Sequence, residues 1–600
     1  MKIITAVWGC ALLLLGGLPM AYAQGDPVIF TIDMTGPSTD TFLVEIIAPK
    51  LGKDNGVFQF ASTAPGAYQV MDIGRYISHF RAFDKRNQEI PVRKIQTNQF
   101  EISSPKKVRR ITYQVAETWD IPVSENVVYK MSGSSLEKDH ALINIHTLLG
   151  YFHGMQDAEM EIRLVYPPAW TVGTALEFNE NGRLFAPDFD FAVDSPILLG
   201  RLSATSIEIG GKEIEIFTYS KNDLIKSDHL MNAMRDVFIA TSQFVKGFPI
   251  DRYVLLFHFE DANAGAWEHS YSSEYVLKEA PLDENYANLI NGIAAHEIFH
   301  MVTPLNIHSE LIEQFNFITP TPSRHLWLYE GVTEWASDMI RLRGGLITLE
   351  EFLHEISEKI TIDGHFDKDV SLQKLAMSAF TPEGQTQYVN IYHRGALVPL
   401  LMDILLLEKS GGQKGLREVI LDLAKKYGPA RAFSEEDFYD EFVAMTHPEM
   451  RTVIDRYIIE AEPLPIAGYV EKLGIRYFPV LVYDEMIPDR GHVIEYNGKE
   501  LVVSALRERS EREGLMQNDI VLAIDSIEAV AANFPEIIAI LQGVAAGDTI
   551  TYNVKRGEEV LELPLSVGEQ KKTEEHVFRL MENASPEQIA LREAWMRKLD

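Results

Sequence analysis

The chain has 600 residues, 46% of them hydrophobic, which is enough for about three or four domains with their own cores. Its formal net charge of −32 argues against nucleic acid, anionic membrane surfaces and strongly acidic molecules as partners. An acidic, self-repelling surface is also typical of soluble proteins, and we favour that plain interpretation of the charge.

The N-terminus has the features of an export signal. A short basic start precedes a mostly apolar run at 3–18 and an Ala-Tyr-Ala cleavage site that ends at Ala23. Cleavage there would remove Cys10, the only cysteine, and leave no disulfide or thiol nucleophile. No other stretch is long and apolar enough to span a bilayer. We expect residues 1–23 to be removed and the mature protein to be exported, periplasmic or secreted, without a transmembrane segment.

Residues 24–200 have the pattern of an antiparallel β domain. Short runs of alternating polarity, such as 41–47 and 110–115, are separated by turn residues. Residues 201–465 begin with further strands and become helical from about 285 onward. The sequence therefore predicts a β domain followed by a mainly helical domain.

The sequence His296-Glu297-Ile-Phe-His300 falls in a predicted helix. Apolar residues recur at helical spacing from Tyr286, and Pro304 ends the helix. Two imidazoles four residues apart project from nearly the same face and can take adjacent corners of a tetrahedral zinc site. Glu297 can accept a proton from the attacking water. The plain alternative is a buried helix whose histidines are only hydrogen-bonded.

A second amphipathic helix is predicted from about 327 to 343, where Gly344-Gly345 ends it. Glu330 on this helix would supply a third ligand, and the fourth position would stay open for water and substrate, as in catalytic zinc sites. Glu334 lies four residues later on the same side and could accept a hydrogen bond from a ligand histidine. These residues predict one catalytic Zn²⁺ per chain.

Two other segments carry candidate substrate-binding and catalytic residues. Gly265 and Glu268 belong to a Gly-Ala-Trp-Glu-His segment, and a carboxylate beside the zinc could bind the α-ammonium group of a peptide, as in an aminopeptidase. A surface Glu-His turn is the alternative. The Tyr392 hydroxyl could stabilise an oxyanion, or Tyr392 could be a core aromatic ahead of an apolar helix. This helix is predicted from Gly395 through Leu407, and because Pro399 lies inside it we expect a kink or an early start.

Residues 466–567 return to a strand pattern. The segment 509–525 and the strand 547–556 resemble the core of a bacterial PDZ domain, which can bind peptide C-termini by adding a strand to a sheet edge. A structural appendage that binds nothing is the alternative. The tail at 568–600 is polar and is predicted to be helical, with a helix start at Ser585-Pro586.

With these motifs the chain resembles the glycyl aminopeptidase family of zinc metallopeptidases, which are PDZ-containing members of the gluzincin group. The resemblance extends over nearly the whole mature chain, and it includes the Thr-Ala-Pro-Gly-Ala-Tyr stretch at 63–68. It implies a multidomain α+β protein with an N-terminal antiparallel β domain, a thermolysin-like, mainly helical zinc peptidase domain and a C-terminal PDZ domain, acting on peptide substrates.

The same resemblance implies a preference for peptides that begin with Gly or Ala. This chain has Ala266-Trp267 where the family commonly has Gly-Leu, which would alter the pocket for the first side chain. A PDZ-assisted periplasmic endopeptidase and a non-catalytic peptide-binding protein remain alternatives. The resemblance assigns roles to six residues: His296, His300 and Glu330 as zinc ligands, Glu297 as general base, Glu268 as amine-binding glutamate and Tyr392 as oxyanion tyrosine.

Overall fold

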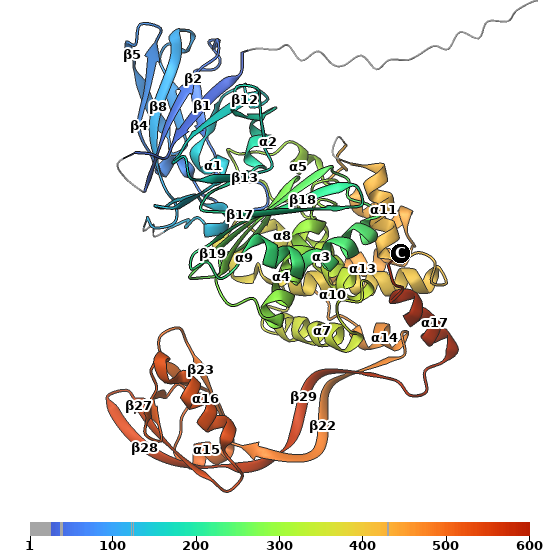
Figure 1. The fold of residues 1–600 in the computed structure, drawn as a ribbon. Coiled ribbons are helices and arrows are strands. Elements are labelled where there is room, and N and C mark those ends of the chain that lie inside the picture. The colour runs from blue at the N-terminus through green and yellow to red at the C-terminus, as the bar shows by residue number, and fades with distance from the viewer. Residues whose placement is uncertain (1–25, 37–39, 122, 124, 429–430, 600) are drawn as a thin grey trace, which may run out of the picture. The chain divides into compact units, whose positions relative to one another are not determined.

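The computed structural model describes residues 26–36, 40–121, 123, 125–428 and 431–599. The predicted signal at 1–23 lies outside these residues. The chain forms two compact units, and each is described by itself (Figure 1). The first unit contains the chain up to Phe352, Ile362–Pro465 and the end from Ile589, and the second contains Leu353–Thr361 and Ile466–Gln588.

The N-terminal part of the first unit consists of three sheets, as predicted for a β domain. In β1 alternate residues are buried, so its apolar side chains face the core and its polar ones face solvent. The pairing is antiparallel except between β1 and β12, which run parallel. The largest sheet has the order β14 (Glu177–Phe178), β15 (Leu184–Ala186), β12 (Met160–Val165), β1 (Val28–Asp33), β2 (Thr41–Ile47), β8 (Val108–Ala116), β4 (Ile77–Asp84) and β5 (Glu89–Ile90).

Two four-stranded sheets complete this domain. Three phenylalanines, Phe58, Phe60 and Phe100, pack edge to face in its core. One sheet has the order β13 (Thr171–Thr174), β16 (Ile197–Gly200), β10 (His140–Ile143) and β9 (Ser135–Leu136). The other has the order β11 (Gly150–Phe152), β3 (Val57–Phe60), β7 (Gln99–Ile102) and β6 (Val92–Gln96).

A five-stranded sheet begins the second half of the first unit. Its order is β17 (Ser203–Ile209), β18 (Lys212–Ser220), β19 (Arg252–Glu260), β21 (Ser272–Lys278) and β20 (Gly265–Glu268). The central strands β18, β19 and β21 are parallel, and β19 is buried along nearly its whole length, as expected for a strand covered on both faces. The edge strand β20 is antiparallel and carries the Gly-Ala-Trp-Glu segment.

Helices pack on this sheet and on one another (Figure 1). α3 (Ser227–Val245) covers β17 and β18, and α4 (Glu284–Phe299) packs on α3 and α6 (Val332–Arg343). α10 (Asn390–Lys409) starts upstream of Gly395 and contains Pro399, so the early start that the sequence allowed is correct. Two short helices, α1 (Ile145–Leu148) and α2 (Phe189–Val193), belong to the N-terminal β domain. The other helices of the first unit are α5 (Glu310–Glu313), α8 (Leu372–Met377), α9 (Pro382–Gln387), α11 (Leu416–Lys426), α12 (Phe438–Met445) and α13 (Met450–Ile454), with α7 (Leu349–Asp363) shared by both units.

Among the described residues, α10 is the one helix with the length and hydropathy of a bilayer-spanning segment. The sequence analysis found no such segment after the leader. However, 89% of the apolar window of α10 is buried inside the fold. Its hydropathy is therefore explained by its place in the protein core.

The second unit is a sheet with short helices. The sheet has the order β23 (His492–Tyr496), β24 (Leu501–Leu506), β25 (Ile520–Ile524), β27 (Thr549–Arg556) and β28 (Glu559–Ser566), and β26 (Ile527–Glu528) pairs with β25. Its core contains Val503, Leu515 and Tyr552. The unit also contains α14 (Ile466–Glu471), α15 (Glu508–Arg512), α16 (Phe534–Gly543) and a separate ribbon of β22 (Ile475–Asp489) and β29 (Gly568–Leu580).

The strand β29 corrects one prediction, because the tail was expected to be helical from 568. Its polar residues alternate between partly buried and exposed positions, and its backbone pairs with β22 along most of its length. That pairing stabilises a strand without an apolar face. The predicted helix start is correct for α17 (Pro586–Trp595): the Ser585 N–H donates to Gln588 Oε1 at 2.8 Å, and the Gln588 N–H donates to Ser585 Oγ at 3.3 Å.

Candidate metal centre

Three buried side chains converge between α4 and the turn that precedes α6. The distance from His296 Nε2 to Glu330 Oε2 is 3.5 Å, and that from His300 Nε2 to the same oxygen is 3.6 Å. Zinc bonds of about 2.0–2.2 Å to nitrogen and oxygen imply tetrahedral ligand–ligand distances of about 3.3 Å. The three ligand atoms all lie within 4.8 Å of one another, so they fit one zinc ion with little movement.

Each histidine is oriented through its other ring nitrogen. His296 Nδ1 donates a hydrogen bond to Glu334 Oε2 at 2.8 Å, and His300 Nδ1 donates to the Thr303 carbonyl at 2.9 Å. These bonds leave both Nε2 atoms facing Glu330. Metal-binding histidines are typically held by such bonds, which fix the ring and its tautomer. The sequence prediction placed Glu334 at this position, and the structure brings it there.

The charges of the cluster favour a cation between its carboxylates. Burial lowers the pKa of His300 to about 4, so this imidazole is neutral and has a free lone pair. Burial also acts to lower the pKa of His296, but hydrogen bonds to Glu330 and Glu334 outweigh it, and the pKa is raised. Burial acts to raise the pKa of Glu330, but the nearby histidines and a hydrogen bond from Tyr68 keep this pKa low. Binding of Zn²⁺ would displace the proton of His296 and leave two neutral imidazoles and one ionised carboxylate, which are donors that Zn²⁺ prefers.

Glu330 lies in a π-helical turn, Trp327–Gly331, which leads into α6. The sequence predicted one regular helix over 327–343, so its first turn differs from the prediction. A Cβ on Gly331 would lie 2.4 Å from the Gly395 carbonyl oxygen of α10. Only two glycines permit this close approach, which brings Glu330 next to the helix that carries Tyr392.

The other predicted residues surround the three ligands. Glu297 is buried, and burial raises its pKa to about 8. Glu268 has a carboxylate oxygen within 4.8 Å of ligand atoms of Glu297 and His300. Desolvation, followed by the charges of Glu330 and Glu297, raises the pKa of Glu268. Both carboxyl groups are therefore stronger bases than a solvent-exposed glutamate as long as no cation lies between them.

Tyr392 and Gly265 complete the predicted set. The ring of Tyr392 lies 5.7 Å from that of His296, and desolvation, then the charge of Glu330, raises the pKa of its hydroxyl. It is therefore a hydrogen-bond donor at neutral pH. Gly265 begins β20 at φ +112°, and a Cβ there would lie 2.6 Å from Met131 Sδ. Gly265 thus packs against Met131. Glu268, at the other end of β20, is the residue of this strand whose carboxylate lies near the metal ligands.

A loop of the N-terminal domain, for which the sequence alone predicts no role, also reaches this centre. Tyr68 has a left-handed backbone with φ 44°, and the charges of Glu330 and Glu268 add to burial in raising the pKa of its hydroxyl. A Cβ on Gly66 would lie 2.5 Å from Glu268 Oε1. In the sequence, the 63–68 stretch was the one feature that pointed to this loop, and it did so only through the resemblance to the family.

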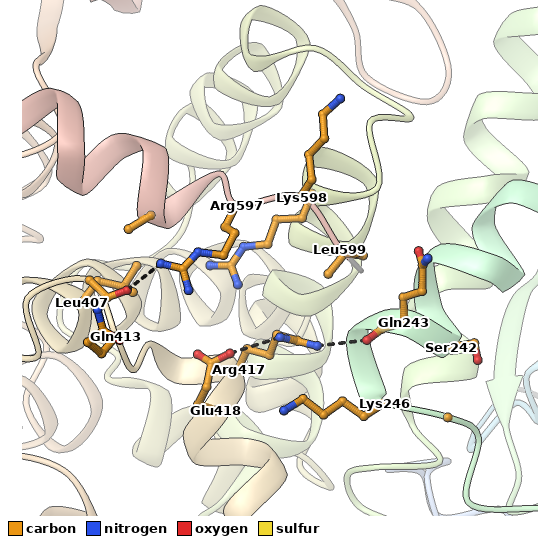
Figure 2. Close-up of a pocket in the computed structure, with 14 residues that line it drawn as sticks. Ser242, Gln243, Lys246, Leu407, Gln413, Arg417, Glu418, Arg597, Lys598 and Leu599 are labelled. Atoms are coloured by element: carbon orange, nitrogen blue, oxygen red, sulfur yellow. Dashed lines mark hydrogen bonds and ion pairs between the residues drawn. The ribbon is translucent and has the colours of Figure 1, made fainter.

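The pocket shown in Figure 2 is separate from this centre. It has a volume of about 600 Å³ and lies between α3, α10, α11 and the C-terminal segment. Its lining includes Lys246, Arg417, Arg597 and Lys598, and Arg417 pairs with Glu418. None of the predicted site residues lines it, so the pocket is not where the predicted chemistry would take place.

Two family matches correspond to the two halves of the first unit. Residues 29–201 match the M61 peptidase N-terminal domain, and residues 290–398 match the M61 glycyl aminopeptidase domain. Over these two segments the chain is similar to the M61 peptidases. It is a metallopeptidase, and the second match contains the His296–Glu330 cluster and Tyr392. Both matches end before residue 466, so the PDZ assignment stays a prediction.

Comparison of structures shows the same fold in another protein. An aminopeptidase N family protein from Idiomarina loihiensis has a TM-score of 0.76 at 18% identity, covering 95% of this chain and 100% of that one. An M1 zinc metallopeptidase from Deinococcus radiodurans has a TM-score of 0.47 at 11% identity, covering 74% of this chain and 95% of that one. No curated protein matches the chain.

The contact between Glu334 and His296 predicts an effect on metal binding. Glu334→Gln should weaken Zn²⁺ affinity by about 10- to 100-fold, because the neutral amide no longer holds the imidazole in its metal-binding orientation as firmly. Competition with a chromogenic chelator measures this affinity. Glu350→Gln, at an exposed position at the start of α7, is the matched control and should bind as the wild type does. Equal affinity in both variants would contradict the role given to Glu334.

Proposed function

We propose that this metallopeptidase is a zinc aminopeptidase that removes N-terminal residues from peptides, with a preference for small residues such as Gly or Ala. The observation that carries the proposal is the position of Glu268. Its carboxylate lies within 4.8 Å of Glu297 and His300. An α-ammonium group bound there would place the first peptide bond, and no later one, beside Glu297.

The N-terminal domain supports an exopeptidase arrangement. Since a methyl group on Gly66 would lie 2.5 Å from Glu268 Oε1, there is little space on that side of the carboxylate. Tyr68, on the same loop, is close enough to Glu268 for the charges to interact. A substrate with further residues before the bound amine would have to displace this loop.

The site residues divide the chemistry among them. Held by His296, His300 and Glu330, a zinc ion would lower the pKa of a water molecule and polarise the scissile carbonyl. Glu297, whose pKa burial raises to about 8, can accept a proton from the attacking water and return it to the leaving amine. The Tyr392 hydroxyl can donate a hydrogen bond to the oxyanion that develops on the carbonyl. Glu268 orients the substrate.

A single hydroxyl tests the oxyanion role. Tyr392→Phe should lower kcat by about 10²–10³-fold with little change in KM, because the hydrogen bond forms only as negative charge develops. Steady-state kinetics on an alanyl peptide measure both constants. Tyr388→Phe is the matched control, because the ring of Tyr388 lies 6.0 Å from that of Tyr392. This variant should change kcat by less than about tenfold. Equal losses in the two variants would contradict a specific role for Tyr392.

The proposal as a whole is tested with two peptides that differ only at the N-terminus. The zinc-loaded protein should cleave the peptide with a free amine, leave its N-acetylated counterpart intact, and lose activity to a chelator. Cleavage of both peptides at internal bonds would instead support the endopeptidase alternative. Cleavage of neither, across peptides with Gly, Ala and larger first residues, would support a peptide-binding protein.

We propose in addition that residues 466–567 act as a PDZ module. Besides the sequence resemblance, β23 is an edge strand of its sheet, and Tyr496 on it packs against Phe534 of α16 at 5.3 Å. An edge strand beside a helix can accept a peptide C-terminus as an added strand. Fluorescence anisotropy with the full chain should show binding of a peptide with a free apolar C-terminus and not of its amidated form. Equal binding of both would contradict the proposal.

Export is likewise a proposal that rests on the leader sequence. The predicted cleavage after Ala23 would leave Gln24 as the first residue of the mature protein. Mass spectrometry of the N-terminal peptide from the extracellular or periplasmic fraction tests this. A chain that keeps residue 1 and stays inside the cell would contradict export.

A further inference from the structure

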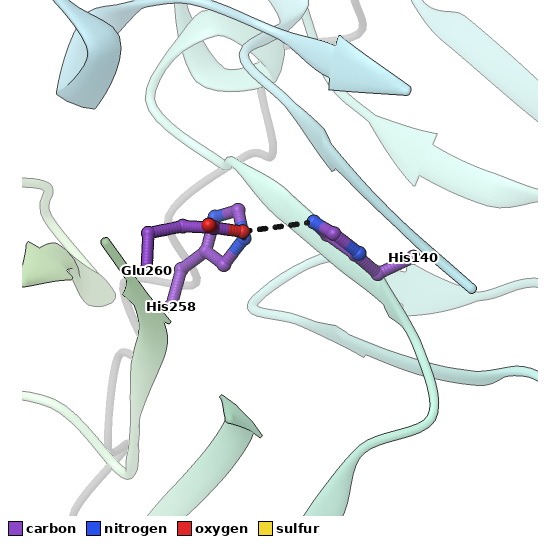
Figure 3. A group of neighbouring side chains, drawn as sticks. All are labelled: His140, His258 and Glu260. Carbon is purple, nitrogen blue, oxygen red and sulfur yellow. Dashed lines mark ion pairs between the residues drawn. The ribbon is translucent and has the colours of Figure 1, made fainter. Parts of the chain in front are cut away.

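A second cluster of metal-binding side chains lies outside the catalytic centre (Figure 3). His140 comes from β10 of the N-terminal domain, and His258 and Glu260 come from β19 of the five-stranded sheet. His140 Nε2 lies 3.5 Å from Glu260 Oε1, and His258 Nε2 lies 3.3 Å from the same oxygen. These distances match the tetrahedral spacing of about 3.3 Å expected for zinc ligands.

The cluster repeats the geometry of the catalytic ligands. In both places two imidazole rings have centroids 4.8 Å apart and are nearly perpendicular, at 73° here and 77° in the pair His296–His300. In both places each Nε2 lies 3.3–3.6 Å from one carboxylate oxygen. Two histidines and a glutamate are thus arranged alike at two sites in one chain.

Three of the four ring nitrogens of this cluster have no hydrogen-bond partner. His140 and His258 are only 2% and 1% exposed, yet His140 Nε2 and both ring nitrogens of His258 have no hydrogen-bond partner. Both Nε2 atoms face Glu260 Oε1, at 3.5 Å from His140 and 3.3 Å from His258. Buried polar atoms without partners cost free energy and are rare in folded proteins. A cation between the two Nε2 atoms and Glu260 would satisfy two of these three nitrogens.

Neighbouring groups hold the three side chains in place. His140 Nδ1 donates to Asp139 Oδ1 at 3.0 Å, which leaves Nε2 with its lone pair toward Glu260. Lys221 donates to Glu260 Oε2 at 3.1 Å, which leaves Oε1 for the histidines, and Asp261 balances the charge of Lys221 at 2.7 Å. The rings stack on Tyr219, 3.7 Å from His140, and on Trp119, 5.1 Å from His258.

We propose that His140, His258 and Glu260 bind a second Zn²⁺ ion, which ties β10 of the N-terminal domain to β19 of the five-stranded sheet. Two imidazoles and one carboxylate suit Zn²⁺ and not Ca²⁺ or Mg²⁺, which prefer oxygen ligands. With three protein ligands, the fourth position is left to a water molecule. The ion stabilises the contact between the N-terminal domain and the five-stranded sheet. The N-terminal domain also contributes Gly66 and Tyr68, which lie beside Glu268.

Metal analysis of the full chain tests this proposal. After loading with ZnCl₂ and removal of free metal, the wild type should contain two zinc ions per chain. The double variant His296→Ala/His300→Ala should retain one, and Glu260→Gln should also retain one. Glu137→Gln removes an exposed glutamate three residues before His140 and should retain two. One ion in the wild type and none in the His296→Ala/His300→Ala variant would overturn the proposal.

A second readout does not depend on metal retention during purification. In the His296→Ala/His300→Ala background, Co²⁺ should give the visible absorption of a tetrahedral N/O site, and Zn²⁺ should raise the thermal midpoint. Both effects should disappear when Glu260→Gln is added and persist when Glu137→Gln is added. Persistence of both effects in the Glu260→Gln variant would overturn the assignment of these ligands. Failure of peptidase activity alone leaves this result unaffected, so the two proposals fail separately.

Discussion

Glu297→Gln should lower kcat by about 10³–10⁴-fold while zinc content and KM stay near their wild-type values. The amide cannot accept the proton that the attacking water must lose. The side chain is next to His296 in sequence, and metal binding by His296, His300 and Glu330 does not require it. Steady-state kinetics on a free-amine peptide measures kcat and KM, and mass spectrometry measures the zinc content.

Glu284→Gln is the matched control for this variant, because Glu284 lies on the same helix at an exposed position. It should retain full activity and full zinc content. If Glu297→Gln kept more than about a tenth of wild-type kcat, another group would be the general base. If the variant lost its zinc together with its activity, the loss would reflect a damaged site and the assignment of Glu297 would fail.

Glu268→Gln should lower kcat/KM for a free-amine peptide by roughly 30- to 10³-fold. Removing one partner of a buried charge pair typically costs about 2–4 kcal/mol, and 1.4 kcal/mol is a factor of ten. The neutral amide fills the same space but no longer attracts the α-ammonium group. The ratio of kcat/KM for free and N-acetylated peptides should therefore fall sharply, and that ratio is the quantity to measure.

The alternatives give a different result for this variant. An endopeptidase does not recognise the free amine, so Glu268→Gln would change both peptides by the same factor and leave the ratio unchanged. Zinc content should be as in the wild type, since Glu268 lies beside the ligands without belonging to the set of two histidines and Glu330. An unchanged ratio with full zinc content would contradict the role of Glu268.

The metal ligands could be predicted from the sequence because helical geometry fixes them. The four-residue spacing of His296 and His300 places both rings on one face of a helix. The same spacing predicted that Glu330 and Glu334 share a side, although Glu330 lies in a π turn and only Glu334 is in α6. The same local logic correctly gave the capped start of α17 at Ser585. Local spacing and capping rules thus predict these features without knowledge of the fold.

Other features depend on contacts that no local pattern encodes. Tyr68 reaches the centre only because the N-terminal domain packs as it does, and the loop that carries it has no distinctive periodicity. The π turn before α6 depends on the close approach of Gly331 and Gly395, which comes from helix packing. The strand at Gly568–Leu580 was misread as helix because its polar residues suggest an exposed helix until the pairing with β22 is seen.

The second histidine cluster illustrates the same limit. His140 and His258 have no regular spacing in the sequence, and they meet because β10 and β19 belong to neighbouring sheets. In the sequence alone they are two isolated histidines within apolar strands. Only their unpartnered nitrogens and the shared distance to Glu260 in the folded chain point to a metal.

The most direct test of the central claim is a crystal structure of the zinc-loaded Glu297→Gln variant with the tripeptide Gly-Ala-Ala bound. The account predicts that the α-ammonium group contacts Glu268 and that the first carbonyl oxygen lies beside the Tyr392 hydroxyl, with the metal held by His296, His300 and Glu330. A tripeptide bound with its amine away from Glu268, and with a later peptide bond beside residue 297, would contradict it.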